Sequence, residues 1–137
     1  MTERADVELR LPAEGAYASV LRTTTAALAA RLDFTVEDIE DLRMAVAEAT
    51  AMVLEVADEG TDLVSRFELE PGRMTVTMSV GAQSPDEPDY DSFGWQVLTT
   101  LSTRAEADSD AGRFTVSMTV TSTAVDPGGA STPEANA

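Results

Sequence analysis

Few residue types in this chain can carry chemistry, because the sequence contains neither histidine nor cysteine. Thiol nucleophiles, zinc sites and histidine-based acid–base triads are therefore excluded. Among the remaining carboxylates, Glu48 is followed four residues later by Met52. On a helix that spacing puts both side chains on one stripe. Because a thioether is a poor ligand for Mg²⁺, which prefers hard oxygen donors, the pair does not predict a metal site.

Arg22, on the first predicted helix, has a side chain that could bind a partner. Its planar guanidinium can pair with a carboxylate through two hydrogen bonds, and Thr23, Thr24 and Thr25 beside it are small and polar. In a chain with few cations, one arginine makes a specific anchor. The alternative is an ordinary surface arginine on a helix.

The charge balance limits the kinds of partner. The sequence has 25 acidic and 9 basic residues, a formal net charge of −16. Such a chain repels nucleic acid and anionic membranes and attracts basic partners, although the acidity could also serve solubility alone. It has no apolar run of membrane-spanning length, and its first residues lack the order of a signal peptide. We therefore expect a cytoplasmic protein.

Hydrophobic periodicity predicts the elements that must position these residues. Alternation predicts a strand at 7–11, and helical spacing predicts a helix over 14–32. A second helix is expected to start after Thr35 as N-cap, with Asp38 as a capping-box partner, and to run to about Ala57. This second helix carries Glu48 and Met52 opposite its most apolar face.

The second half of the chain predicts a hairpin, a short helix and two more strands. Ser92 is expected to cap the helix, and Phe93, Val97, Leu98 and Leu101 form its apolar face. The predicted elements are strands at 63–69 and 74–80, a helix at 92–101, a short strand at 104–107 and a last strand at 114–120.

The order of these elements predicts the architecture. Because strands and helices do not alternate regularly, we expect an α+β fold: a two-layer sandwich of a mostly antiparallel sheet with helices on one face. One domain is expected over residues 6–121. Residues 122–137 lack an apolar period and are rich in proline, glycine and small polar residues, which predicts a disordered C-terminal tail.

The segment 38–52 resembles the N-box helix of RsbW-like anti-sigma factors, which are serine-protein kinases of the GHKL ATPase superfamily. The segment 92–101 resembles the region of the family's second glycine box, and it is more similar still to the UsfX-like actinobacterial branch. It reads Ser-Phe-Gly-Trp-Gln-Val-Leu-Thr-Thr-Leu. The end of the first helix, 26–33, is also similar to the family. The resemblance covers roughly residues 6–121 and implies the histidine-kinase-like ATPase fold.

The resemblance also implies a nucleotide site that has lost its residues. In the family, the N-box glutamate activates the attacking hydroxyl and an asparagine four residues later holds Mg²⁺. Glu48 matches the glutamate, but Met52 occupies the asparagine position. Ala82 and Ser84 stand where the first glycine box has aspartate and glycine, and only Gly94 remains of the second box.

Each of these residues also has an ordinary structural interpretation. Glu48 could be a solvated acid, Met52 could pack in the core or at an interface, and Gly94 could allow close helix–sheet packing. Trp95 could pack against the sheet or serve as an exposed anchor. We expect no ATP or metal to bind, because the loop at 81–91 is also acidic.

The partners follow from the resemblance. In the family, an arginine at the place of Arg22 contacts the sigma factor and its antagonist, and the first strand and helix form a homodimer interface. We therefore expect an anti-sigma factor of a stress response, released by a STAS-domain anti-anti-sigma protein. Two alternatives remain: an active serine kinase that uses ATP and Mg²⁺ to phosphorylate the STAS protein, and a noncatalytic adaptor that binds only the STAS protein.

Overall fold

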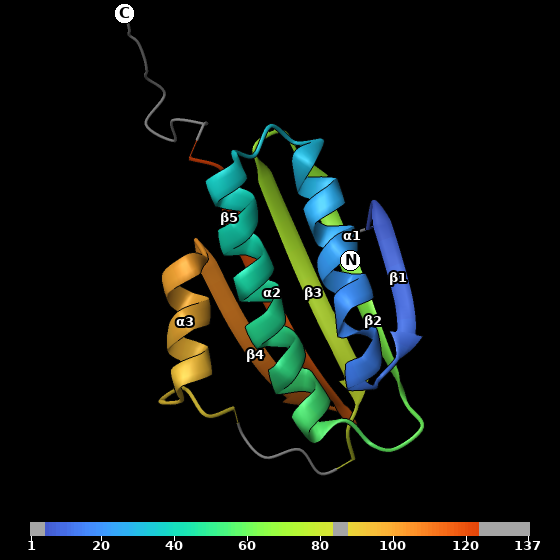
Figure 1. Cartoon of the computed structure of the whole chain (residues 1–137). Helices are drawn as coiled ribbons and strands as arrows, with labels where there is room; N and C mark the ends of the chain where they lie inside the picture. Colours follow the sequence, from blue (N-terminus) through green and yellow to red (C-terminus); the bar gives the residue numbers. More distant parts are fainter. Residues whose placement is uncertain (1–4, 84–87, 124–137) are drawn as a thin grey trace, which may run out of the picture.

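In the part of the chain that the structure describes, a five-stranded antiparallel sheet carries three α-helices on one face, which confirms the predicted α+β sandwich (Figure 1). The structure is a computed structural model and describes residues 5–83 and 88–123. Its elements are β1 (Val7–Pro12), a 3-10 turn (Gly15–Tyr17), α1 (Ala18–Ala30), α2 (Val36–Val56), β2 (Asp62–Glu70), β3 (Arg73–Gly81), α3 (Phe93–Leu101), β4 (Arg104–Asp110) and β5 (Arg113–Thr121).

The strands run in the spatial order β1-β2-β3-β5-β4. Two hairpins form this order: β2 turns into β3 at Gly72, and β4 turns into β5 at Gly112, both with positive φ. Glycine suits both turns because it adopts left-handed backbone angles without steric cost. Strand β5 then pairs with β3, which leaves β1 and β4 as the two edge strands.

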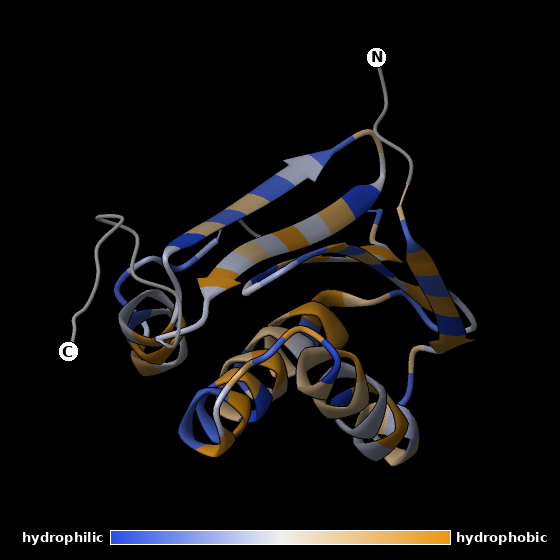
Figure 2. Cartoon of the chain, turned by 90° about the horizontal axis from the view of Figure 1, so that it is seen from above, coloured by the Kyte–Doolittle hydropathy of each residue, from blue (hydrophilic) through white to orange (hydrophobic). Residues whose placement is uncertain are grey.

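The core lies between the helices and the sheet. Hydrophobic and hydrophilic residues alternate along the strands (Figure 2). Burial alternates in the same way along β3 and β5, so one face of the sheet is apolar and the other is polar. Helix α2 lies over β3 and β5, with α1 on one side of it and α3 on the other (Figure 1). The largest fully buried side chains are Phe67, Leu21, Leu42, Met74, Met78, Leu98, Met118, Val46, Val53, Val76, Val80 and Val116.

The start of α2 is fixed by the predicted capping box and by contacts from the end of the sheet. The Asp38 N–H donates to Thr35 Oγ1 at 3.0 Å, and the Thr35 N–H donates to Asp38 Oδ2 at 3.2 Å. Asp38 also accepts from Ser122 Oγ at 3.0 Å and from the Thr123 N–H at 2.9 Å. The carboxylate of Asp38 therefore ties the first turn of α2 to the residues that follow β5.

Burial of Asp38, which is 6% exposed, works to raise the pKa of its carboxyl. The hydrogen bonds from the Thr123 backbone and from the Thr35, Ser122 and Thr123 side chains outweigh that effect. The net result is a pKa below its ordinary value.

The structure departs from the sequence-based expectations in four places. The helix predicted over 14–32 divides into a 3-10 turn and α1, and the strand predicted at 104–107 extends to Asp110. Phe93, expected on the apolar face of its helix, is 77% exposed, because this first position of α3 points away from the core. Hydrogen-bonded structure also continues through Ser122 and Thr123, two residues beyond the expected domain end. Residues 124–137 of the expected tail lie outside the described residues.

None of the helices in the described part of the chain is both long enough and apolar enough to cross a membrane.

Candidate functional site

The two helices that carry the candidate residues meet at Gly94, on the first turn of α3. A Cβ at this position would lie 2.9 Å from Glu48 Oε1 and 3.4 Å from Met52 Cε. Because Gly94 has no side chain, α3 can approach α2 closely. The sequence had suggested that Gly94 allows close packing of a helix on the sheet, but the close contact is between two helices. Glu48 and Met52 share one stripe as expected, and both are half-buried beneath α3.

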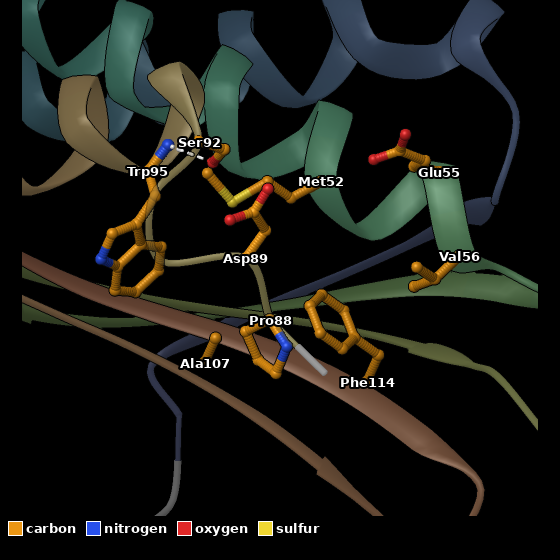
Figure 3. Close-up of a pocket in the computed structure, with 9 residues that line it drawn as sticks. All are labelled: Met52, Glu55, Val56, Pro88, Asp89, Ser92, Trp95, Ala107 and Phe114. Atoms are coloured by element: carbon orange, nitrogen blue, oxygen red, sulfur yellow. Dashed lines mark hydrogen bonds between the residues drawn. The ribbon is translucent and has the colours of Figure 1, made fainter. Parts of the chain in front are cut away.

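A cavity of about 450 Å³ opens beside this contact. Figure 3 shows its walls: side chains from the end of α2, from the segment before α3, from the start of α3 and from β4 and β5. Six of the lining residues are apolar, and Phe114 forms part of the buried floor. The lining residues are Met52, Glu55, Val56, Pro88, Asp89, Ser92, Trp95, Ala107 and Phe114.

A second hollow of about 440 Å³ also borders Met52. It shares Met52, Glu55 and Ser92 with the first cavity, and it is also lined by Glu48, Ala51 and Gly94. The Met52 side chain therefore contributes to the walls of both spaces, at the position where the resemblance implies an asparagine.

Trp95 is held in place by the segment that leads into α3. The backbone N–H of Trp95 donates to Ser92 Oγ at 3.1 Å, so Ser92 caps the helix as the sequence predicts. The Tyr90 and Trp95 rings form a T-shaped pair with centroids 5.1 Å apart, and the Tyr90 hydroxyl donates to the Ala107 carbonyl at 3.4 Å. Trp95 is half-buried and packs on the core, which favours its interpretation as a packing residue over that of an exposed anchor. Part of its side chain also lines the cavity.

The electrostatic character of the cavity is acidic. Glu55 and Asp89 are the charged side chains among its described lining residues, and no lysine or arginine lines either hollow there. Asp89 Oδ1 accepts a hydrogen bond from the Asp91 N–H at 3.0 Å, so its carboxylate is held at the rim. Among the described residues, Glu55 takes part in no ion pair.

The residues present do not fit a magnesium–nucleotide complex. The thioether of Met52 offers no hard oxygen donor for Mg²⁺, and the Glu48 carboxylate lies close to Gly94, where it would repel a phosphate. Ala82 is 1% exposed, has no polar side-chain atom for an adenine amino group and does not line the cavity. Ser84 lies outside the described residues. Across 5–83 and 88–123, no cluster of three acidic residues could hold a metal ion.

Arg22 stands apart from the cavity. It lies on α1, is half-buried, and takes part in no ion pair or side-chain hydrogen bond within the described residues. Its guanidinium is therefore not committed to an intramolecular carboxylate there. The structure brings Glu48, Met52, Gly94 and Trp95 together and leaves Arg22 on a separate surface.

Sequence reasoning missed Glu55, Asp89 and Phe114 as lining residues. Glu55 had a usable signal, because it follows Met52 by three residues and Glu48 by seven, which keeps all three on one side of a helix. Phe114 had none, since alternation along a strand identifies a core residue but not the cavity that it borders.

Comparisons with known proteins identify relatives along most of the chain. A serine-protein kinase RsbW from Bacillus velezensis is 30% identical over 134 residues, covering 82% of this chain and 83% of that protein. An RsbW from Halalkalibacterium halodurans is 38% identical over 81 residues, and one from Bacillus subtilis is 32% identical over 95 residues. The chain spans only 50% and 58% of the length of these two relatives. No protein-family model matches the sequence.

One solved structure shares the fold. The crystal structure of the RsbU and RsbW domains of a Mycobacterium tuberculosis protein superimposes with a TM-score of 0.64 at 16% identity. The match covers 85% of this chain and 31% of that one. The expected histidine-kinase-like ATPase fold is therefore confirmed.

Proposed function

The chain belongs to the RsbW family of anti-sigma factors and serine-protein kinases, and from that premise we propose that it sequesters an alternative sigma factor by protein–protein binding. Sequestration requires no reaction, only an affinity that denies the sigma factor to RNA polymerase. One observation carries this proposal. Met52 occupies the position on α2 where a kinase of the family would have its magnesium ligand, and the Met52 side chain lies close to Gly94.

We propose further that the domain works without ATP and Mg²⁺. Phosphoryl transfer depends on positioned cations that stabilise charge on the phosphates. The hollows beside Met52 supply carboxylates instead, and the described residues that line them include no arginine or lysine. Glu48 is then a remnant of the catalytic stripe. Without a bound nucleotide there is no phosphoryl transfer for this base to assist.

Arg22 is proposed as the contact for both the sigma factor and its antagonist. Its guanidinium has no carboxylate partner among the described residues, so it is available to one on another protein. A STAS-domain anti-anti-sigma protein that bound the same surface of α1 would release the sigma factor by competition. The switch then depends on the difference between two affinities.

The proposed setting is a stress-response complex in the cytoplasm, with the domain as a homodimer. Strand β1 is an edge strand, and its unpaired backbone edge needs covering. Together with α1 it presents a surface that a second copy could cover. The partners are proteins, because the charge of −16 opposes binding to nucleic acid and anionic membranes.

Co-purification from the native cell tests the proposal. The tagged protein should retain a sigma factor after washing in nucleotide-free buffer containing a chelator. Recovery of a STAS protein alone would support the adaptor alternative.

The kinase alternative has a separate assay, because the relatives are named as serine-protein kinases. The purified domain would be incubated with a STAS partner and labelled ATP with Mg²⁺. Our proposal expects no label on the STAS protein, and a serine-linked label would show that the domain is an active kinase.

A further inference from the structure

We propose that the cavity between α2, α3 and the sheet binds a small organic cation, an amine carried on an apolar or aromatic body. This inference concerns a ligand of the domain itself and does not depend on which protein partner α1 contacts. It assigns the cavity a chemistry opposite in charge to that of a nucleotide.

The size and the walls of the cavity suit a small apolar body. Its volume of about 450 Å³ lies within the range of small-molecule sites, which are commonly about 300–1,000 Å³. Six of its nine described lining residues are apolar, and the Trp95 and Phe114 rings stand among them (Figure 3). An aromatic or aliphatic group that entered would exchange water for these side chains, which favours binding.

The charge of the rim selects the sign of the ligand. Glu55 and Asp89 line the cavity, Glu48 lines the adjoining hollow, and no cationic side chain lines either within the described residues. Glu55 has no ion-pair partner in that part of the chain. An ammonium group at the rim would find carboxylate acceptors close to the Trp95 ring, whereas an anion would meet uncompensated like charge.

The walls are already held in place before any ligand binds. Ser92 fixes the Trp95 backbone, the Tyr90 ring packs on the Trp95 ring, and the Tyr90 hydroxyl bonds to Ala107 in β4. A site whose walls are fixed loses less conformational freedom on binding. These contacts therefore keep the cavity open between α3 and β4.

The experiment uses Trp95, the single tryptophan of the chain, as an internal reporter of the cavity. The protein is titrated with phenethylamine, with 3-phenylpropionate and with phenethyl alcohol, which are cationic, anionic and neutral probes of similar size. Tryptophan emission and calorimetry follow each titration. We expect saturable binding of the amine, at least tenfold tighter than that of the carboxylate, with the alcohol between them.

Two matched variants separate the role of the rim from that of overall charge. Glu55→Gln should weaken amine binding at least threefold and leave the alcohol unchanged. Asp41→Asn removes one charge from an exposed position of the same helix that does not line the cavity, and it should leave amine binding unchanged. Circular dichroism checks that both variants fold.

The proposal is overturned if the amine gives neither a fluorescence change nor heat, or if the amine and the carboxylate bind equally. It is also overturned if Glu55→Gln and Asp41→Asn weaken the amine to the same extent, because the effect would then come from net charge alone.

Discussion

Glu48 and Met52 show what a residue pattern can specify at a site. Their spacing of four on a helix predicted a shared stripe, and the structure places both beneath α3. What the spacing could not specify is the neighbour that covers them. Gly94 lies more than forty positions further along the chain, and its close approach to Glu48 depends on how the two helices pack.

Arg22 is the residue on which we expect partner binding to depend. Arg22→Ala should raise the Kd for the sigma factor at least thirtyfold, because truncating one member of a desolvated ion pair costs roughly 2–5 kcal/mol. The free energy of unfolding should change by less than about 1 kcal/mol, since Arg22 makes no ion pair among the described residues that its removal would break. Arg22→Lys should recover little binding, because lysine lacks the planar fork. Calorimetric titration and denaturant unfolding measure the two quantities.

The matched control is Arg43→Ala, which removes an exposed arginine from α2 that pairs only with Glu40 at 3.7 Å among the described residues. That variant should bind the sigma factor as the parent does. If Arg22→Ala binds normally while Glu48→Ala does not, the binding surface lies on α2 rather than α1.

At the scale of elements, the first turn of α2 depends on Asp38. Asp38→Ala removes the acceptor for the Thr35 and Thr123 backbone N–H groups, and each hydrogen bond to a charged group is worth about 1.5–3 kcal/mol. We expect the free energy of unfolding to fall by about 2–4 kcal/mol, measured by urea denaturation. Asp41→Asn, at an exposed position one turn further along, should cost less than about 0.5 kcal/mol. Equal losses in the two variants would contradict this role.

The same residue predicts a dependence of stability on pH. The pKa of Asp38 is lower in the folded chain than its ordinary value of 3.8, so the folded state favours the ionised carboxylate. Its stabilising contribution is complete above that ordinary value and is lost as the pH falls through the folded pKa. Between about pH 5 and strong acid, the window in which such a carboxylate takes up its proton, the parent should therefore lose more stability than Asp38→Ala. Parallel slopes for the two proteins would refute the assignment.

The C-terminal boundary can be tested by two truncations. Removing residues 126–137 should leave the melting temperature unchanged, because that segment has no apolar period. Ending the chain after Thr121 also removes Ser122 and Thr123, which donate to Asp38, and should lower the melting temperature by about 5–10 °C. Differential scanning calorimetry compares the two. A large drop on removing residues 126–137 alone would show that the tail contributes to folding.

The elements themselves were largely predictable, and their long-range ties were not. Strict alternation at Met74, Val76, Met78 and Val80 predicted β3, and Thr35 with Asp38 predicted the start of α2. The bond between Asp38 and Ser122 joins residues 84 positions apart. Local periodicity contains no information on such a contact, and for that reason the expected domain end was two residues short.

For the whole molecule we predict a homodimer through β1 and α1. Val20 is an exposed apolar residue on α1, and Val20→Glu should produce a monomer by placing a carboxylate in the proposed interface. Val36→Glu is the matched control, because Val36 is also exposed and apolar but lies at the start of α2. Sedimentation at tens of micromolar should give a dimer for the parent and the control. A monomeric parent would rule out the dimer.

The arrangement of the sheet shows the limit of pattern reasoning for the whole molecule. The alternating segments predicted antiparallel strands with one buried face, but not the order β1-β2-β3-β5-β4. That order places β5 between β3 and β4, and it brings Phe114 and Ala107 to the cavity beneath Trp95. Periodicity could not predict it, because hydrophobic alternation is the same whichever strand is the neighbour.

The most direct test of nucleotide-independent sequestration is a calorimetric titration of the domain with its sigma factor, with and without Mg²⁺ and ATP. We predict saturable binding with the same Kd in both conditions, because Met52 offers no hard oxygen donor for Mg²⁺ and the charged side chains that line the hollows beside it are carboxylates. Absence of binding, or binding that appears only when Mg²⁺ and ATP are present, would contradict the account.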